Sequence, residues 1–382
     1  MPICRALATG LVAVACCLFV SATAQDQTDV PPGLTDPVVL KPFVPHKDLC
    51  AVPSGLNPSL VFVQDNRREF MEGVGTGLAR AALDRGLSYD NLVADDDAQR
   101  MIDDAARLLQ DGGGAIVVAP VNPRSLAPTL QALIARGVYV GAVVPPPAVT
   151  ILNAPQYLTG KILADEAATY IDEKLDGHAN VVLLTHDSLQ FLAPRFTAMR
   201  DVLGKLPDVR IVADISPAVV NEDGGYQTMK TILLAQPNVD VVLGADTVVL
   251  GAMRALSEAG KLRADQFLGG IDGEPDAIAA IEHVDSAYKA TVSLASPVFG
   301  YALGQFAADW LEGKYVPQAM DVLPTLLTPL NLDQYRADLA APDLVWADPA
   351  RRNSYLRMYG SICYDTRESY LNFSWSSEDA AD

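Results

Sequence analysis

The sequence lacks the features that catalysis, metal binding and nucleic-acid binding usually require. Its four histidines are scattered without the spacing of a metal site, and no Gly-x-Ser-x-Gly or comparable nucleophile motif occurs. Only 28 residues are basic against 47 acidic ones, and a formal net charge of −19 repels phosphate backbones and anionic headgroups. We therefore expect no enzyme activity, no metal or other cofactor, and no nucleic-acid partner.

The N-terminus carries an apolar run that is too short to span a bilayer comfortably. This run covers residues 7–20, follows the single charge of Arg5, and precedes a stretch of small residues that ends at Ala24. A short charged start, an apolar centre and small residues at the end are typical of a secretory signal. We predict a signal peptide over residues 1–24 that is cleaved after Ala24, and hence a periplasmic protein; the alternative is an uncleaved membrane anchor.

Cysteine is also rare. Of five cysteines, three fall within the expected signal, which leaves Cys50 and Cys363 near opposite ends of the remaining chain. In an oxidising compartment two such cysteines usually pair. We predict a Cys50–Cys363 disulfide that joins an N-terminal arm to the C-terminal tail; the alternative is two buried free thiols.

The rest of the chain has the composition of a folded globular protein. Half of its 382 residues are hydrophobic and a fifth are charged, and the length suffices for two domains. Short apolar runs, which we interpret as strands, alternate with amphipathic stretches, which we interpret as helices. The expected strands are Leu60–Gln64, Asn91–Ala94, Ala115–Ala119, Val138–Val144, Asn180–Thr185, Val209–Ala213, Val239–Gly244, Gln266–Ile271 and Tyr288–Leu294. The expected helices lie near 70–86, 98–111, 124–136, 158–176, 191–205, 223–236, 248–260, 274–283 and 297–312.

This alternation predicts an α/β fold made of βαβ units and parallel sheets. Nine units are many for one sheet, and the prolines that follow Val144 interrupt the series. We therefore expect two doubly wound lobes. Beyond residue 340 the alternation stops and aromatic residues become dense, which favours a tail that packs on the body; a partner-binding tail is the alternative.

In open α/β sheets, ligands bind outside the carboxyl ends of the strands. The polar and aromatic residues that follow the expected strands are Asp65, Asn66, Arg67, Phe70, Asn122, Gln190, Arg195, Asn221, Asp246 and Asp272. Carboxylates and amides can bracket hydroxyl groups, arginine donates in a planar fork, and an aromatic ring can cover an apolar sugar face. These residues predict a site for a small polyhydroxylated ligand, although several of them could instead be helix N-caps.

Residues from about 58 to 330 resemble the type I periplasmic sugar-binding proteins, the ribose-binding-like receptors of ABC importers. The resemblance is carried by Gly244-Ala245-Asp246-Thr247, by Leu250-Gly251-Ala252-Met253-Arg254-Ala255-Leu256, and by Gly269-Gly270-Ile271-Asp272-Gly273-Glu274-Pro275. It implies two lobes joined by a three-crossover hinge, near 148–154, 290–294 and 318–325, that closes on a ligand. Asp272 falls on the family's sugar-binding aspartate and Arg195 on its ligand arginine.

With these crossovers we expect four parts after the signal. They are an extended arm at 25–57, an N-terminal lobe at 58–147 plus about 295–318, a C-terminal lobe at 148–294 plus about 319–332, and a C-terminal extension at 333–382. The resemblance implies a monomeric receptor that hands its ligand to an ABC permease. A sensory protein that presents its ligand to a membrane receptor or kinase, and a receptor for a non-sugar molecule, are the alternatives.

The chain departs from the family mainly in the first lobe. Sugar receptors carry Asp-Arg where this chain has Val144-Pro145, and Asn-x-Phe-Phe where it has Arg67-Arg68-Glu69-Phe70-Met71. They also carry Asn-Asp where it has Ala245-Asp246, and a glutamine near Leu294. Either the ligand is not a standard pentose or hexose, or other residues replace the lost contacts. The arginines after the first strand could favour an acidic or phosphorylated ligand.

Overall fold

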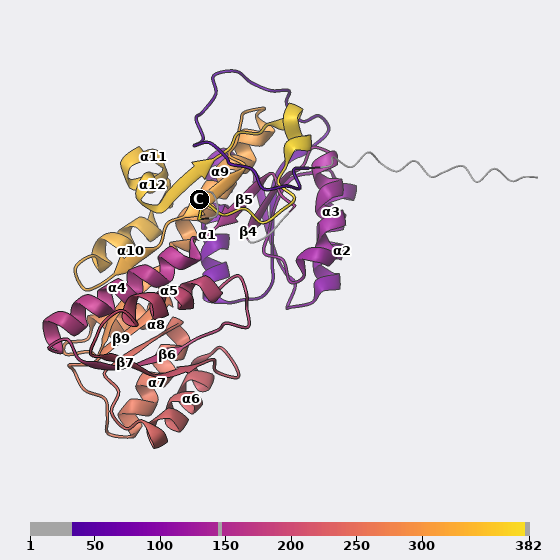
Figure 1. Cartoon of the computed structure of the whole chain (residues 1–382). Coiled ribbons are helices and arrows are strands. Elements are labelled where there is room, and N and C mark those ends of the chain that lie inside the picture. Colours follow the sequence, from indigo (N-terminus) through magenta and orange to yellow (C-terminus); the bar gives the residue numbers. More distant parts are fainter. Residues whose placement is uncertain (1–32, 144–146, 379–382) are drawn as a thin grey trace, which may run out of the picture.

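A computed structural model describes residues 33–143 and 147–378 of the chain. The expected signal, its cleavage position and most of the proline run at 144–147 lie outside the described residues. Two α/β lobes lie next to each other, and each is built around its own sheet (Figure 1). The expected fold class of two parallel-sheet lobes is confirmed. Within the described part of the chain, no helix combines the length and apolar character needed to cross a membrane.

The first lobe is built on a seven-stranded sheet. Its strands are β1 (Asn57–Gln64), β2 (Ser88–Val93), β3 (Gly113–Val118), β4 (Tyr139–Val143), β5 (Thr150–Asn153), β11 (Ala319–Val322) and β13 (Leu356–Tyr359). They pair in the order β13-β11-β5-β4-β3-β1-β2, and all pairs are parallel except β11 with β13. Strands β3 and β4 are buried along their whole length, which explains their unbroken apolar sequences.

The second lobe is built on a six-stranded sheet. Its strands are β6 (Ala179–Leu184), β7 (Val209–Ile215), β8 (Val241–Gly244), β9 (Phe267–Asp272), β10 (Tyr288–Ser293) and β12 (Thr325–Leu327). They pair in the order β12-β10-β9-β8-β6-β7, and only β12 runs antiparallel to its neighbour. Every strand expected between residues 60 and 294 is present with shifted ends.

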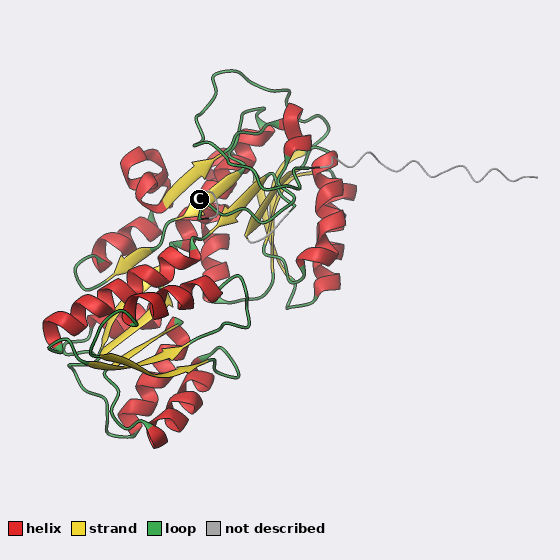
Figure 2. Cartoon of the chain, in the orientation of Figure 1, coloured by secondary structure: helices red, strands yellow, loops and turns green. Residues whose placement is uncertain are grey.

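Helices flank both sheets, as Figure 2 shows. Those of the first lobe are α1 (Glu69–Arg85), α2 (Ala98–Asp111), α3 (Pro123–Ala135) and α9 (Ser296–Leu311). Those of the second lobe are α4 (Gln156–Lys174), α5 (Ala193–Leu203), α6 (Glu222–Ala235), α7 (Asp246–Glu258) and α8 (Pro275–Glu282). Helix α1 packs against α9, α4 against α5, and α6 against α7. A Cβ on Gly77 of α1 would lie 2.1 Å from the Pro297 carbonyl oxygen, so this glycine allows α1 and α9 to approach closely.

The chain passes between the lobes three times as expected, and then once more. The three passages follow β5, follow β10, and connect β11 to β12. The expected boundaries assigned residues 148–153 and 319–322 to the second lobe, whereas strand pairing places β5 and β11 in the first sheet. Strand β4 ends at Val143, before the prolines. Strand β5 then pairs parallel with β4, so the chain stays in the first lobe until β5 ends.

The fourth passage returns the C-terminal extension to the first lobe. The extension contains α10 (Leu332–Ala340), α11 (Pro342–Ala347), α12 (Pro349–Tyr355), β13 and the 3-10 helix η1 (Tyr364–Ser369). Strand β13 forms the edge of the first sheet, and Tyr370 and Trp375 are buried. The Cys50–Cys363 disulfide is present and joins the arm to this extension, with 6.3 Å between the Cα atoms. Residues 33–56 form no helix or strand of their own.

Candidate ligand-binding site

An arginine and an aspartate meet at the carboxyl end of the second sheet. Arg195, in the first turn of α5, has its Nη1 atom 3.7 Å from Oδ1 of Asp272, the last residue of β9. The Arg195 Nε group also donates to Oε1 of Gln156 at 2.8 Å, and only 6% of Arg195 is exposed. Burial lowers the pKa of Arg195, because a charge is costly away from water, and the neighbouring Asp272 carboxylate opposes this effect.

The backbone at Asp272 adopts a conformation that side chains rarely take. Its φ angle is 120°, and Gly273 follows with φ 71°. Such backbone persists only where its surroundings hold it, and it is concentrated at functional sites. The Asp272 side chain is 32% exposed, whereas Arg195 is almost fully covered. Burial raises the pKa of Asp272, and the charges of Arg195 and Arg68 act in the opposite direction.

Asp246 holds this loop from behind. It is fully buried and accepts hydrogen bonds from the Tyr288 hydroxyl at 2.7 Å, the Thr291 hydroxyl at 2.8 Å, and the Glu274 backbone N–H at 2.8 Å. Burial raises the pKa of Asp246 to about 7, and these hydrogen bonds counteract the rise. Asp246 therefore supports the loop that carries Asp272. It was predicted as a ligand contact, but its side chain is fully buried and is bonded to other protein groups.

The polar side chains of the first lobe are bonded to one another. Asp65, directly after β1, accepts from the Arg68 guanidinium and from the Asn66 backbone N–H at 2.8 Å. The Asn66 side-chain amide donates to Asp96 Oδ1 at 2.9 Å. The structure thus brings Asp65 and Asn66 together at the cleft edge of the first sheet, but their hydrogen-bonding groups are already in use.

Two further predicted residues of the first lobe, Arg67 and Phe70, follow β1 closely in the sequence. Arg67 is 71% exposed in its side chain, and its guanidinium lies 3.8 Å from the Glu72 carboxylate. Phe70 is half-buried in α1, with its ring centroid 5.7 Å from that of Phe299. Because Arg68 is held by Asp65 and Arg67 lies near Glu72, the two arginines do not form an open anion site.

Carboxyl groups of the two lobes lie close enough to act on each other electrostatically. Burial and, after it, the negative charges of Asp272, Asp246, Glu69 and Asp276 together raise the pKa of Glu274 to about 8. Glu69 begins α1 in the first lobe, so charges on one lobe act on groups of the other. Arg68 of the first lobe acts on Asp272 with the opposite sign. Groups of both lobes therefore set the electrostatic potential around Asp272 and Glu274.

Three further predicted residues follow strands of the two sheets, but they lie in exposed loops or at the starts of helices. Asn122 caps α3 by accepting the Ser125 N–H at 3.2 Å, and Asn221 caps α6 by accepting the Gly224 N–H at 2.8 Å. Gln190 is exposed in the loop before α5. Among the described residues, no hydrogen bond or ion pair joins these three to Arg195 or Asp272.

Sequence reasoning missed two residues that the structure places at the site, Gln156 and Gln64. Gln156 begins α4 and orients Arg195, but nothing in its sequence neighbourhood marks it. Gln64 ends β1, is fully buried, and has an Oε1 atom without a hydrogen-bond partner among the described residues. A glutamine at the end of an otherwise apolar strand was a usable signal, because buried polar groups normally need a partner.

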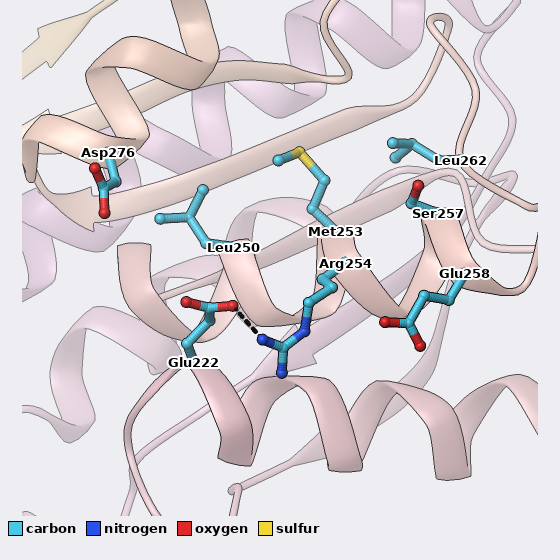
Figure 3. A pocket seen from close by; sticks show the side chains of 8 residues that line it. All are labelled: Glu222, Leu250, Met253, Arg254, Ser257, Glu258, Leu262 and Asp276. Carbon is cyan, nitrogen blue, oxygen red and sulfur yellow. Dashed lines mark hydrogen bonds and ion pairs between the residues drawn. The ribbon is translucent and has the colours of Figure 1, made fainter.

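A separate pocket lies on the second lobe. Leu250 and Met253 are among the residues that line it, and Glu222 is paired with Arg254 (Figure 3); the Arg254 Nη1 atom lies 2.7 Å from Oε1 of Glu222. Arg254 also bonds Asp223 at 2.8 Å, so its charge is already compensated. This pocket is formed mainly by α6 and α7, whereas Arg195 and Asp272 belong to α5 and β9. Nowhere in residues 33–143 and 147–378 are three His, Cys, Asp or Glu side chains grouped to hold a metal ion.

Two parallel-sheet lobes joined by crossovers are the architecture of type I periplasmic binding proteins. The chain belongs to the periplasmic binding protein family, since the model of its domain matches residues 60–315. The resemblance seen in the sequence motifs is therefore confirmed.

Individual relatives bind sugars or polyols. The chain is 26% identical over 280 residues to the ribose import binding protein of Bacillus subtilis, covering 69% of this chain and 83% of that one. It is 28% identical over 200 residues to a xylitol-binding protein of Mycolicibacterium smegmatis, covering 50% of this chain and 55% of the relative. The crystal structure of a periplasmic ribose ABC transporter protein from Conexibacter woesei superposes with a TM-score of 0.64 at 20% identity, covering 75% of this chain and 96% of that one.

Proposed function

We propose that this protein is a periplasmic receptor that captures a neutral sugar or polyol between its lobes and delivers it to an ABC permease. The observation that carries the proposal is the Arg195–Asp272 pair, two polar groups 3.7 Å apart at the cleft edge of the second sheet. The arginine can donate to ligand oxygens and the carboxylate can accept from ligand hydroxyls, which is the combination that a polyhydroxylated molecule needs.

A neutral ligand is favoured over an acidic or phosphorylated one. The carboxyl groups of Glu69 and Asp276 add negative charge near Glu274, and Arg68 is already bound by Asp65. An anion entering the cleft would have to overcome this negative potential. The relatives named above, which bind ribose or xylitol by their names, support the same ligand class.

An importer role is favoured over a sensory role. The sensor hypothesis assigns the aromatic tail to a membrane partner, but Tyr355, Tyr370 and Trp375 are buried against the body of the protein. Buried aromatic residues stabilise the fold and leave little surface for a partner. The same burial supports a monomer whose lobes alone contact the permease.

The proposal is tested by thermal-shift measurements on the purified mature protein. The panel contains D-ribose, xylitol, myo-inositol, other pentoses and hexoses, sugar acids, sugar phosphates and amino sugars. A ligand at one hundred times its dissociation constant adds about 2.7 kcal/mol to the free energy of unfolding, which gives a clear shift. We expect a hit among the neutral sugars or polyols. Hits confined to sugar acids or phosphates would contradict the proposed ligand class.

A matched pair of variants localises any hit to the cleft. Asp272→Asn removes the charge at the proposed site, and Asp208→Asn removes the same charge from an exposed position directly before β7, at the opposite end of the second sheet. The shift should be lost in the first variant and kept in the second. Equal shifts in both variants would place the ligand elsewhere.

A further inference from the structure

The last described residues cross from the first lobe to the second. Trp375 is buried, with its ring centroid 5.0 Å from that of Tyr359 on β13, so the chain at this point is fixed to the first lobe. The next residues include Ser377, whose side chain hydrogen-bonds Asp321 at the end of β11. Asp321 also accepts from the Asn153 amide at 2.7 Å, and Asn153 ends β5. The segment 375–378, called the strap below, thus lies over two of the hinge crossovers.

Glu378 then reaches helix α4 of the second lobe. Its Oε1 atom accepts from the Leu158 backbone N–H at 2.9 Å and its Oε2 atom from the Tyr157 backbone N–H at 3.3 Å. These N–H groups belong to the first turn of α4, where the helix has no partners of its own. The residue at the N-cap position is Pro155, which provides no side-chain cap. Glu378 therefore caps α4 from a distant part of the chain, with a negative charge at the positive end of the helix.

The first turn of α4 also contacts Arg195, the proposed ligand contact. Gln156, the first residue of α4, accepts from Arg195 Nε at 2.8 Å. One turn later, a Cβ on Gly160 would lie only 1.8 Å from the Arg195 carbonyl oxygen, so α4 and α5 touch through their backbones at this point. A change in the first turn of α4 is thus transmitted to both the side chain and the backbone of Arg195.

We propose that Glu378 is a positioning residue for ligand binding: by capping α4 across the hinge, it fixes Gln156 and thereby orients Arg195 toward Asp272. The inference rests on the proposed function, because Arg195 must be a ligand contact for its orientation to matter. The proposal gives the C-terminal extension a role beyond packing, because the strap links the first lobe to the elements of the second lobe that hold Arg195. Loss of the cap should leave the fold intact and loosen Arg195.

The test needs no ligand, so its outcome is independent of whether the ligand class is right. In the full mature protein, hydrogen exchange of the Arg195 Nε–H group is followed by NMR, with its signal assigned by its loss in Arg195→Lys. In Glu378→Ala, this group and the Tyr157 and Leu158 amides should exchange about fivefold faster, the size of a typical capping effect. Glu378→Gln, which keeps one acceptor oxygen, should give a smaller change.

The matched control is Glu368→Ala, which removes the same charge from an exposed position in η1 of the same extension. It should leave the Arg195 signal unchanged. Faster exchange at Tyr157 and Leu158 with an unaltered Arg195 signal would show a cap without a positioning role and overturn the proposal. Unaltered exchange at all three groups would show that Glu378 does not cap α4, which would also overturn the proposal. Equally faster exchange in Glu368→Ala would show a general loss of stability in place of a positioning role, and would overturn it as well.

Discussion

The two lobes differ in how the polar groups at the carboxyl ends of their sheets are arranged. In the second lobe, Arg195 and Asp272 lie 3.7 Å apart and are held by groups behind them, of which Gln156 is one. In the first lobe, Asp65 and Asn66 are hydrogen-bonded to their own neighbours at the surface. Preorganised groups lose little entropy on binding, whereas self-bonded groups must first give up their partners. We therefore propose that the second lobe supplies most of the binding energy and that the first lobe closes over the ligand.

The largest effect is expected from the second-lobe pair. Asp272→Asn keeps the shape of the side chain but leaves the buried Arg195 without its counter-charge. Breaking such a pair typically weakens binding by 2–5 kcal/mol, so affinity for the panel ligand should fall on the order of 100-fold. Isothermal titration calorimetry measures this directly. A loss below about tenfold would refute the view that the second lobe supplies most of the binding energy.

The next effect concerns the support beneath the loop. Asp246→Asn places an amide where the Tyr288 and Thr291 hydroxyls and the Glu274 N–H all donate. Because the amide NH2 group cannot accept, either a hydroxyl must reverse to accept from it or a hydrogen bond is lost inside the protein. Urea unfolding should show a decrease of about 1–3 kcal/mol in the free energy of unfolding. An unchanged free energy of unfolding would mean that Asp246 does not hold the loop.

A smaller effect is expected from the repulsion between Glu274 and the neighbouring carboxylates. Burial and the neighbouring carboxylates raise the pKa of Glu274 from 4.5 to about 8. The folded state therefore binds a proton more tightly than the unfolded state, and stability falls as pH rises through the interval between these values. In Glu274→Gln this part of the pH dependence should disappear, and the variant should be more stable than the native protein above about pH 8.

Unfolding curves at about pH 5.5 and about pH 8.5 measure this difference. Asp246, whose pKa burial raises to about 7, contributes pH dependence of the same sign and remains in the variant. The variant should therefore keep a reduced slope. A slope equal to that of the native protein would contradict the assignment of a raised pKa to Glu274.

The smallest effect is expected from the first lobe. Arg67 is 71% exposed and lies 3.8 Å from Glu72, an arrangement that contributes little at a surface. Arg67→Ala should change ligand affinity less than about threefold. A much larger loss would show that Arg67 turns into the cleft on closure and that the first lobe binds as actively as the second.

The sequence predicted the sheets well because buried parallel strands are apolar along their whole length. Strands β3 and β4 are examples, and their positions matched the expected ones closely. The sheet membership of β5 and β11 was not predicted, because short strands beside a hinge carry no signal that tells which lobe they pair with. The disulfide was predicted from cysteine count alone, and it is confirmed.

The site was predictable only in part. Asp272 and Arg195 were predicted because strand ends and family motifs mark them, and the structure places their side chains 3.7 Å apart. The same reasoning selected Asn122 and Asn221, whose side chains cap helices, because an amide after a strand serves either purpose. Gln156 was missed, since its position depends on how α4 meets α5 and not on any local pattern.

Hydrogen–deuterium exchange with and without the panel ligand tests the central claim most directly. Binding between the lobes should protect the backbone around Arg195 and around Asp272 in the second lobe, together with residues 65–72 in the first. The surface around Leu250 and Met253, in the separate pocket of the second lobe, should be unchanged. Protection confined to that pocket, or to one lobe without the Arg195 and Asp272 segments, would contradict a cleft site built on this pair.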